Sequence, residues 1–246
     1  MEGKIQELDN KIKNLNTDEN IEELEASHYV LEKGKIYKEH NYIKESIESF
    51  KNVIDKCLSF NLKMDAVFEI MLLAIHQKDL ILLKEYLDIC KKNLKDGGDW
   101  EKRNKMKVYE GLYHILTRDF KEAGKLFIDA LMTFTSYELF EYKDFVFYTA
   151  MCNIITVDRN TLKTKIIDNS DVVSCIKDIA YLEDFLNSFY NGQYSNFFNI
   201  FLMLIPRIKN DFFIGKHYKY FVKELKIKAY CQYLRKFKIL FVLFIN

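Results

Sequence analysis

The feature that most limits what this chain can fold into is its shortage of helix-breaking residues. Its 246 residues include one Pro and eight Gly, whereas average usage gives roughly 12 Pro and 17 Gly in a chain of this length. The tight turns of an all-β fold depend on these residues, so the chain has too few of them for such a fold. The composition therefore favours long helices joined by short turns, and the expected fold class is all-α.

Apolar residues recur at helical spacing along the body of the chain. One such stripe spans residues 43–57, at intervals that place the side chains on one face of a helix. Short polar breaks at 38–41, 59–63 and 76–79 separate this stripe from its neighbours. No segment of convincing length alternates with the period of a strand. The pattern predicts that helix, short turn and helix follow one another repeatedly.

Two segments share the spacing of a tetratricopeptide repeat, in which a small residue lets two helices cross closely and an aromatic ring fills the groove beside it. The candidate packing residues are Gly34, Tyr37 and Phe50 in the first copy, and Gly111, Ala123 and Phe127 in the second. The Gly and the Phe are sixteen residues apart in both copies. A weaker copy between them has Tyr86 on its second helix and Ile70 in place of the Gly. Each pair leaves an apolar face that the next pair covers, so residues 28–167 are expected to stack as helix pairs, with a generic helical bundle as the alternative.

The overall charge is almost balanced, with 37 Lys and Arg against 36 Asp and Glu. This argues against a protein that binds nucleic acid through its net charge. The charge is nevertheless unevenly placed, because residues 1–30 carry three Lys against eight acids, whereas residues 206–246 carry ten Lys and Arg against two acids. No apolar run approaches the ~20 residues that span a bilayer, no signal peptide is recognisable, and the five scattered Cys fit reduced thiols. We therefore expect an intracellular protein without a membrane span.

No catalytic or cofactor-binding constellation is recognisable in the sequence. The five His lack metal-ligand spacing to one another or to any Cys, and the common nucleophile and phosphate-binding motifs are absent. His114 is interpreted as a hydrogen-bonded groove residue. Gly97 and Gly98 are interpreted as a turn, with Asp99 as the N-cap of a helix that begins at Trp100 and with the indole wedged between helix pairs. The sequence predicts no enzyme, no metal site and no cofactor.

Four lysines share one face of the last long helix and are the candidate partner-binding residues: Lys216, Lys219, Lys223 and Lys226. Three interpretations stay open for this row. It forms a solvated face, it contacts another protein, or it contacts RNA with the help of Tyr218 and Tyr220, since aromatic rings among basic residues are typical of nucleic-acid binders.

Three stretches go beyond these patterns. They read GGDWEKRNKMKVYEGLY at 97–113, TFTSYELFEYKDFVFYT at 133–149 and HYKYFVKELKIKAYCQYL at 217–234. Together they closely resemble the family of the 26S proteasome non-ATPase regulatory subunit 6, in one register from about Ile5 to about Leu234. The related signalosome subunit would match the second stretch less closely.

The resemblance implies a right-handed superhelix of tetratricopeptide-like helix pairs that leads into a PCI domain, which is a helical segment followed by a winged helix. It implies a non-catalytic structural subunit of the regulatory-particle lid, acting as a protein–protein interaction scaffold in ubiquitin-dependent degradation. The implied partners are other lid subunits, in the cytoplasm and nucleus, with no small-molecule substrate and no cofactor. The alternatives are a PCI subunit of the signalosome and an RNA-binding PCI module of translation or mRNA export.

The chain departs from the family at both ends. It lacks most of the N-terminal extension, and after Leu234 it ends in an apolar run at 239–245 where the family continues into the winged helix. We therefore expect an N-terminal helical segment at 1–27, tetratricopeptide-like repeats at 28–167 and the helical part of an incomplete PCI domain at 168–246, with the winged helix absent. The apolar tail is expected to pack against its own chain or a second copy, which makes self-association a further expectation.

Overall fold

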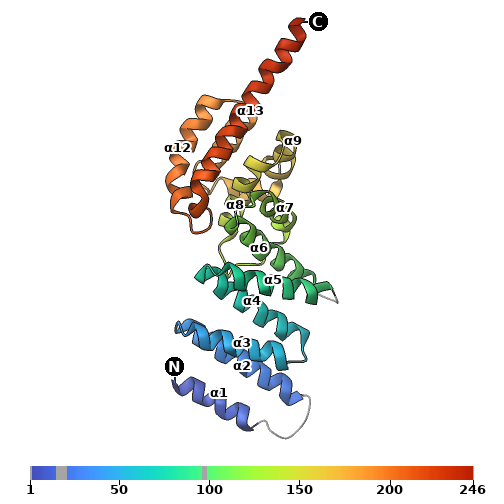
Figure 1. The fold of residues 1–246 in the computed structure, drawn as a ribbon, viewed down its shortest axis with the longest axis vertical. Coiled ribbons are helices and arrows are strands. Elements are labelled where there is room, and N and C mark those ends of the chain that lie inside the picture. The colour runs from blue at the N-terminus through green and yellow to red at the C-terminus, as the bar shows by residue number, and fades with distance from the viewer. Residues whose placement is uncertain (1, 15–20, 96–98, 246) are drawn as a thin grey trace. The chain divides into compact units, whose positions relative to one another are not determined.

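The computed structural model describes residues 2–14, 21–95 and 99–245, without the side chains of residues 2, 13–14, 21–23 and 236–245. Every regular element among the described residues is helical, which confirms the predicted all-α class (Figure 1). The chain divides into two compact units, residues 1–102 and 103–246. The expected boundaries at residues 27 and 167 stay predictions.

The first unit is a succession of helices in which each packs against the next along the chain (Figure 1). Its elements are α1 (Glu2–Asn14), α2 (Ile21–Glu39), α3 (Ile43–Lys56), α4 (Phe60–Gln77) and α5 (Leu80–Lys95). Helix α4 contacts α2, α3 and α5, and residues 70–75 on it are all buried. A helix that is covered on every side has to be apolar all round, which explains why this segment shows no polar face.

The second unit is centred on one buried helix. Its elements are α6 (Trp100–Leu116), which begins in the first unit, α7 (Phe120–Ala130), η1 (Leu131–Thr133), α8 (Tyr142–Thr156), α9 (Arg159–Leu162), η2 (Lys163–Ile167), α10 (Ser170–Ile176), α11 (Leu182–Asn191), α12 (Tyr194–Asn210), η3 (Gly215–His217) and α13 (Tyr218–Ile245). Helix α8 packs against α7, α10 and α13, and residues 145–154 on it are buried. The predicted apolar tail at 239–245 lies at the end of α13, where the side chains are outside the described residues.

Three helical hairpins close with a non-glycine residue in the left-handed region. These residues are Asn41 (φ 65°), Lys78 (φ 58°) and Arg118 (φ 69°). In each turn, the N–H of the following residue donates to a carbonyl five residues back, as from Tyr42 to Tyr37 at 2.9 Å. This is the Schellman ending of a helix, a position that Gly usually takes. The left-handed conformation costs a non-glycine residue about 1–2 kcal/mol. The chain accepts this cost in most of these turns and therefore needs few glycines.

Three predicted local features have clear outcomes. The predicted turn at 191–193 is confirmed, because Gly192 has a φ of 72° and ends α11. Helix α6 begins at Trp100 as expected. The predicted wedge is wrong, since the Trp100 side chain is 62% exposed. Gly97 and Gly98, the predicted turn before it, lie outside the described residues.

Candidate protein interface

The first predicted helix crossing is built on a direct contact between Gly34 on α2 and Phe50 on α3. A Cβ atom placed on Gly34 would lie 2.5 Å from Cε1 of Phe50, and the ring is fully buried. The hydroxyl of Ser46 donates to the carbonyl oxygen of Gly34 at 2.8 Å. A side chain at Gly34 would therefore need the space that the ring occupies. Tyr37, one turn further along α2, packs its ring edge-on against Tyr42 at 6.5 Å.

The second predicted crossing repeats this geometry between α6 and α7. A Cβ atom on Gly111 would lie 2.2 Å from Cε1 of Phe127. The Phe127 ring is fully buried and meets the ring of Phe145 on α8 edge-on at 5.1 Å. Ala123 is buried on the same helix as Phe127. The structure thus brings the Gly and the Phe of each copy together in the same way.

Four hairpins share one register relative to a left-handed turn residue, which is Asn41, Lys78, Arg118 or Gly192. Seven residues before and nine residues after each of them lie the pairs Gly34 and Phe50, Met71 and Leu87, Gly111 and Phe127, and Phe185 and Phe201. The predicted weak copy is therefore wrong by one residue, since Met71 and Leu87 hold the positions assigned to Ile70 and Tyr86. The sequence reasoning missed the fourth pair, whose rings stack at 6.0 Å, because Phe185 replaces the Gly. The Gly192 turn with a Phe nine residues later is the signal that would have found it.

Helix α13 is held in one rotation about its axis. Phe221, Leu225 and Ala229 are buried on one face. Nε2 of His217 lies 2.8 Å from the carbonyl oxygen of Leu116. The side-chain amide of Gln232 donates to the carbonyl oxygen of a residue on α11 at 3.0 Å. These contacts at both ends of the described side chains determine which face of α13 meets the solvent.

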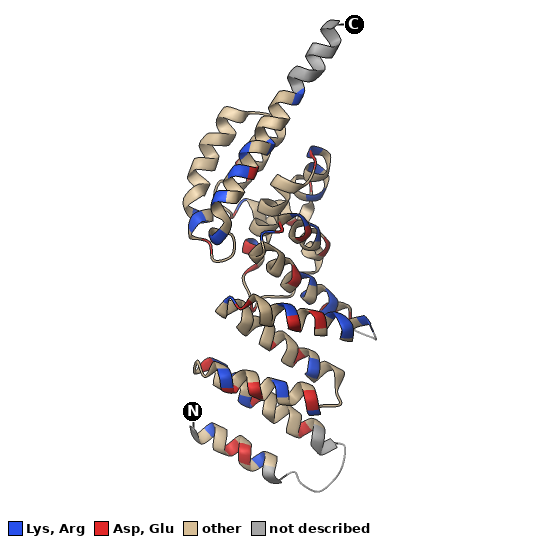
Figure 2. Ribbon diagram, viewed as in Figure 1, with Lys and Arg blue, Asp and Glu red and all other residues tan. Residues whose placement is uncertain are grey.

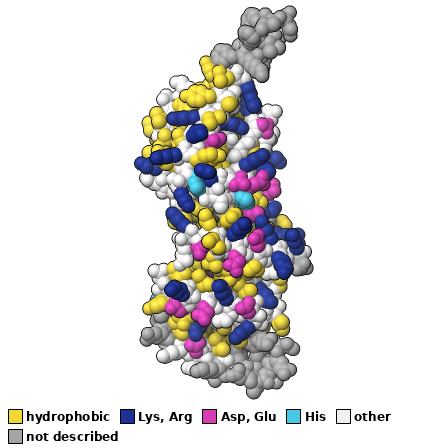
Figure 3. All heavy atoms as spheres, in the orientation of Figure 1, with side chains coloured by type: hydrophobic (Ala, Val, Ile, Leu, Met, Phe, Trp, Pro, Cys, Tyr) yellow, Lys and Arg dark blue, Asp and Glu magenta, His cyan; other side chains and the backbone are white. Residues whose placement is uncertain are grey.

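The predicted lysine row, which we call the basic strip, consists of Lys216 in η3 and of Lys219, Lys223 and Lys226 on the solvent-facing side of α13. The prediction that all four lie on the last helix is therefore wrong for Lys216, which precedes it. All four are exposed, and among the described residues no ion pair or side-chain hydrogen bond reaches them. Figure 2 shows basic residues along the described part of α13. The same side exposes Ile227 and Leu234, which are 44% and 60% accessible. Figure 3 shows hydrophobic and basic side chains next to one another over α12 and α13. Such a mixed surface suits contact with a protein better than a purely charged one does.

An aromatic hollow of about 300 Å³ lies between α12 and α13 beside this strip. The Tyr194 and Tyr233 rings that line it meet edge-on at 5.3 Å. The rings of Phe198 and Tyr230 lie 5.9 Å apart on its other wall. Aromatic pockets of this kind accept single anchoring side chains at protein interfaces.

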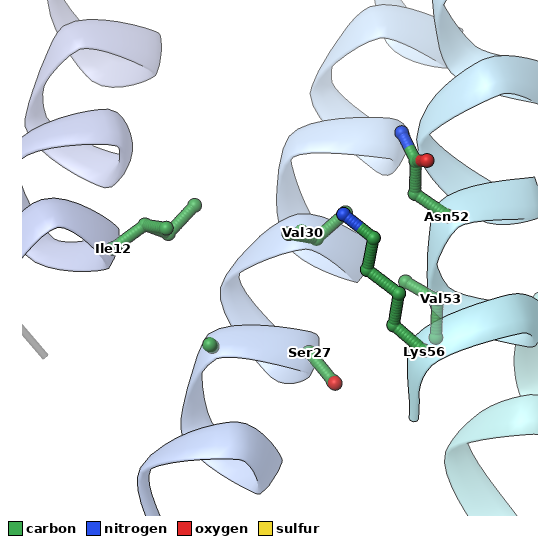
Figure 4. A pocket seen from close by; sticks show the side chains of 7 residues that line it. Ile12, Ser27, Val30, Asn52, Val53 and Lys56 are labelled. Carbon is green, nitrogen blue, oxygen red and sulfur yellow. The ribbon is translucent and has the colours of Figure 1, made fainter. Parts of the chain in front are cut away.

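The first unit has a pocket of about 290 Å³ between α1, α2 and α3 (Figure 4). Ile12 points from α1 toward α2, and Ser27 and Val30 line the pocket from α2. Lys56 on α3 is the one ionisable side chain that lines it. This pocket therefore does not bring two titratable side chains together.

The buried side chains that could take part in a reaction make structural contacts instead. The Tyr148 hydroxyl donates to Oδ2 of Asp211 at 2.7 Å, and Oδ1 of Asp211 accepts from two backbone N–H groups at 2.8 Å each. Burial, followed by the Asp211 charge, raises the pKa of the Cys152 thiol. A protonated, buried thiol is a poor nucleophile. His114 lies in the last turn of α6, where its ring is 3.7 Å from Glu110 and 3.5 Å from Asp119, the N-cap of α7.

No group of three or more His, Cys, Asp or Glu among the described residues is arranged to hold a metal ion. None of the described helices is both long enough and apolar enough to cross a membrane. The exposed side of α13 is therefore the candidate protein interface.

Replacing Tyr148 with phenylalanine is expected to lower the free energy of unfolding at pH 7 by about 1–2 kcal/mol, because the bond to Asp211 is lost. Burial raises the pKa of Tyr148 above its usual value of 10. A folded-state pKa above the unfolded value stabilises the fold at lower pH, and this contribution is lost as the pH rises above about 10. Urea denaturation at pH 7 and pH 11 should therefore show a difference between wild type and variant that shrinks at the higher pH. Tyr137→Phe, at a 68% exposed position, is the control, and an equal loss in both variants would contradict the role of the buried bond.

The comparisons with known proteins identify the family. The family model "26S proteasome subunit RPN7" matches residues 1–165 of this chain. The chain belongs to the RPN7 family. It is 37% identical over 238 residues to the 26S proteasome non-ATPase regulatory subunit 6 of Oryza sativa subsp. japonica, which covers 97% of this chain and 61% of that protein. It is 32% identical over 247 residues to the 26S proteasome regulatory subunit RPN7 of Saccharomyces cerevisiae, which covers 97% of this chain and 56% of that protein.

The match to the signalosome subunit family is weaker than the match to the proteasome subunit family. The COP9 signalosome complex subunit 1 of Arabidopsis thaliana is 25% identical over 135 residues, which covers 54% of this chain and 31% of that protein. The resemblance to the proteasome subunit family is therefore confirmed. The chain spans about three fifths of the length of the RPN7-family relatives that it matches.

The RPN7 family model and the exposed side of α13 cover different parts of the chain. The match includes both Gly–Phe crossings, which lie within residues 34–127, and it ends at residue 165. The basic strip and the aromatic hollow lie beyond that end, although the pairwise matches to RPN7-family relatives extend over 97% of the chain. The packing residues therefore belong to the part that the family model describes.

Proposed function

We propose that this chain works as a non-catalytic structural subunit in the lid of the 26S proteasome regulatory particle, as an interaction scaffold in ubiquitin-dependent degradation. The observation that carries this proposal is its membership of the RPN7 family, with 37% identity over nearly the whole chain to a protein named as a proteasome regulatory subunit. We extend that role from the relatives to this chain, which spans about three fifths of their length. Cytoplasmic and nuclear localisation is part of the same proposal.

The structure supports a scaffold rather than an enzyme by how it uses its reactive groups. Tyr148 and Cys152 are buried and protonated, and Asp211 is occupied by hydrogen bonds. The exposed side of α13, in contrast, combines cations with solvent-exposed apolar and aromatic side chains. We propose that the basic strip contacts other lid subunits, since a rim of charges around apolar anchors is typical of protein interfaces.

Affinity purification from cells tests this proposal. The tagged chain, expressed where the cell's own subunit has been depleted, is expected to recover proteasome particles that contain deubiquitinase activity. Lys219→Glu with Lys223→Glu is expected to lower that recovery by about fivefold, because reversed charges on a protein contact oppose association. Lys44→Glu with Lys51→Glu makes the same change at two exposed positions on α3 and should leave recovery unchanged.

Three results would contradict the proposal in different ways. Recovery without proteasome subunits would remove the lid role. Recovery with signalosome particles instead would favour the alternative family. An equal loss in the two charge-reversed pairs would leave the lid role in place and remove the basic strip from the interface.

A further inference from the structure

A second hollow, of about 400 Å³, lies on the other flank of α13 between α13 and α9, and we call it the basic pocket. Three of the residues that line it are cations, namely Arg159, Lys228 and Arg235. Asp158 is the one acid among the lining residues. The lining therefore carries a net charge of +2, from three positive groups and one negative group.

The acid in the basic pocket is already engaged elsewhere. Its carboxylate caps α9 by accepting from the backbone N–H groups of Asn160 at 3.1 Å and Thr161 at 3.3 Å. It also accepts from the Thr161 hydroxyl. Over the described residues, no ion pair reaches Arg159, Lys228 or Arg235. Asp158 raises the pKa of Lys228 and so opposes the effect of the neighbouring cation, but the three cations of the pocket outnumber this one acid.

Lys228 shows the electrostatic consequence of this crowding. Its ammonium group is half-buried and donates to the carbonyl oxygen of Val157 at 2.7 Å. Burial, followed by the neighbouring Arg235 charge, lowers the pKa of Lys228 below its usual range. Like charges brought together away from water are unfavourable, and an anion placed between them would relieve that cost.

Two of the three cations in the basic pocket are held by contacts with other residues. The Arg159 guanidinium lies 4.6 Å from the ring centroid of Tyr190, a cation–π contact that orients its plane. Lys228 is fixed by its bond to Val157, and Gln232 on the pocket wall is fixed by its bond to Phe189. These contacts distinguish Arg159 and Lys228 from the lysines of the basic strip, which make none among the described residues.

We propose that the basic pocket binds the carboxylate side chains of an acidic segment of a partner protein. Its volume is larger than a single small anion needs and accommodates more than one side chain. Guanidinium forks of Arg159 and Arg235 suit bidentate contacts with carboxylates. The aliphatic stems of the Arg and Lys side chains suit the methylenes of glutamate. The inference goes beyond the proposed function, because it holds whichever complex supplies the acidic segment.

A direct binding measurement tests this inference on the intact chain. Fluorescence anisotropy of a labelled hexaglutamate peptide is expected to show saturable binding at low salt that weakens as salt is added. Arg159→Glu with Arg235→Glu is expected to weaken binding by about tenfold or more, because two bidentate contacts become repulsive. Lys216→Glu with Lys219→Glu makes the same charge change on the basic strip and is expected to weaken binding by about twofold or less. Arg235→Gln alone, at an exposed position, gives a milder variant with an expected loss of about threefold.

Each remaining outcome decides against the inference. Lack of saturable binding up to about 1 mM peptide, which corresponds to a very weak complex, would overturn it. Equal weakening by the two charge-reversed pairs would show that overall charge, not the pocket, attracts the peptide. Displacement of the peptide by an equal concentration of inorganic phosphate would assign the pocket to phosphate instead of carboxylate. Melting temperatures of all variants near that of wild type show that the comparison concerns folded chains.

Discussion

Replacing Phe127 with alanine is expected to lower the free energy of unfolding by about 3–5 kcal/mol, the usual cost of removing a fully buried Phe side chain. The ring is completely buried and lies between the backbone of α6 at Gly111 and the ring of Phe145 on α8. Because Gly111 has no side chain that could move into the space, the cavity would stay open. Urea denaturation followed by far-ultraviolet circular dichroism measures the loss.

The control for this variant is Met132→Ala, five residues further along the chain. Met132 is 76% exposed, so its truncation should change stability by no more than about 0.5 kcal/mol. An unchanged urea midpoint for Phe127→Ala would contradict the role of this ring in the core. A loss of equal size in both variants would point to a general effect of truncation near η1.

The helical class and two of the close crossings could be predicted from the sequence, because each rests on a residue type with a single physical meaning. Gly34 and Gly111 lie where only a hydrogen atom fits against a ring, and a Gly inside a helical pattern is visible without a structure. The register of the middle hairpin was not predictable in this way. It depends on Lys78 in the left-handed region, where Asn or Gly would be the expected residue.

The two candidate sites also differ in whether they could be predicted from the sequence. The exposure of the basic strip follows from spacing along one helix, so Lys219 and Lys223 could be assigned to a surface from the sequence. The basic pocket could not be predicted, because Arg159 and Lys228 lie far apart in the chain and share a pocket only after α9 and α13 have packed. The wedge assigned to Trp100 failed because the sequence has no signal for what faces a helix start, and its indole is mainly exposed.

A leucine in place of Gly34 is expected to destabilise the first unit by about 3 kcal/mol, at the upper end of the usual cost of overpacking a core. Its Cβ alone would lie 2.5 Å from the Phe50 ring, and this ring is fully buried. The intrinsic helix propensity of leucine works in the opposite direction, by about 0.8 kcal/mol relative to Gly. Thermal and urea denaturation of the variant measure the net effect.

The matched control is Gly3→Leu, since no atom lies within 4 Å of a Cβ atom built on Gly3. With propensity as the main effect there, this variant is expected to be neutral or slightly stabilised. The decisive test adds Phe50→Ala to Gly34→Leu, because removing the ring also removes the clash. The double variant should then be more stable than the sum of the two single losses predicts, with a coupling of about 1–3 kcal/mol. Additive losses would mean that the leucine at position 34 disturbs something other than the Phe50 ring, and the shared sixteen-residue spacing would then lose its physical explanation in this hairpin.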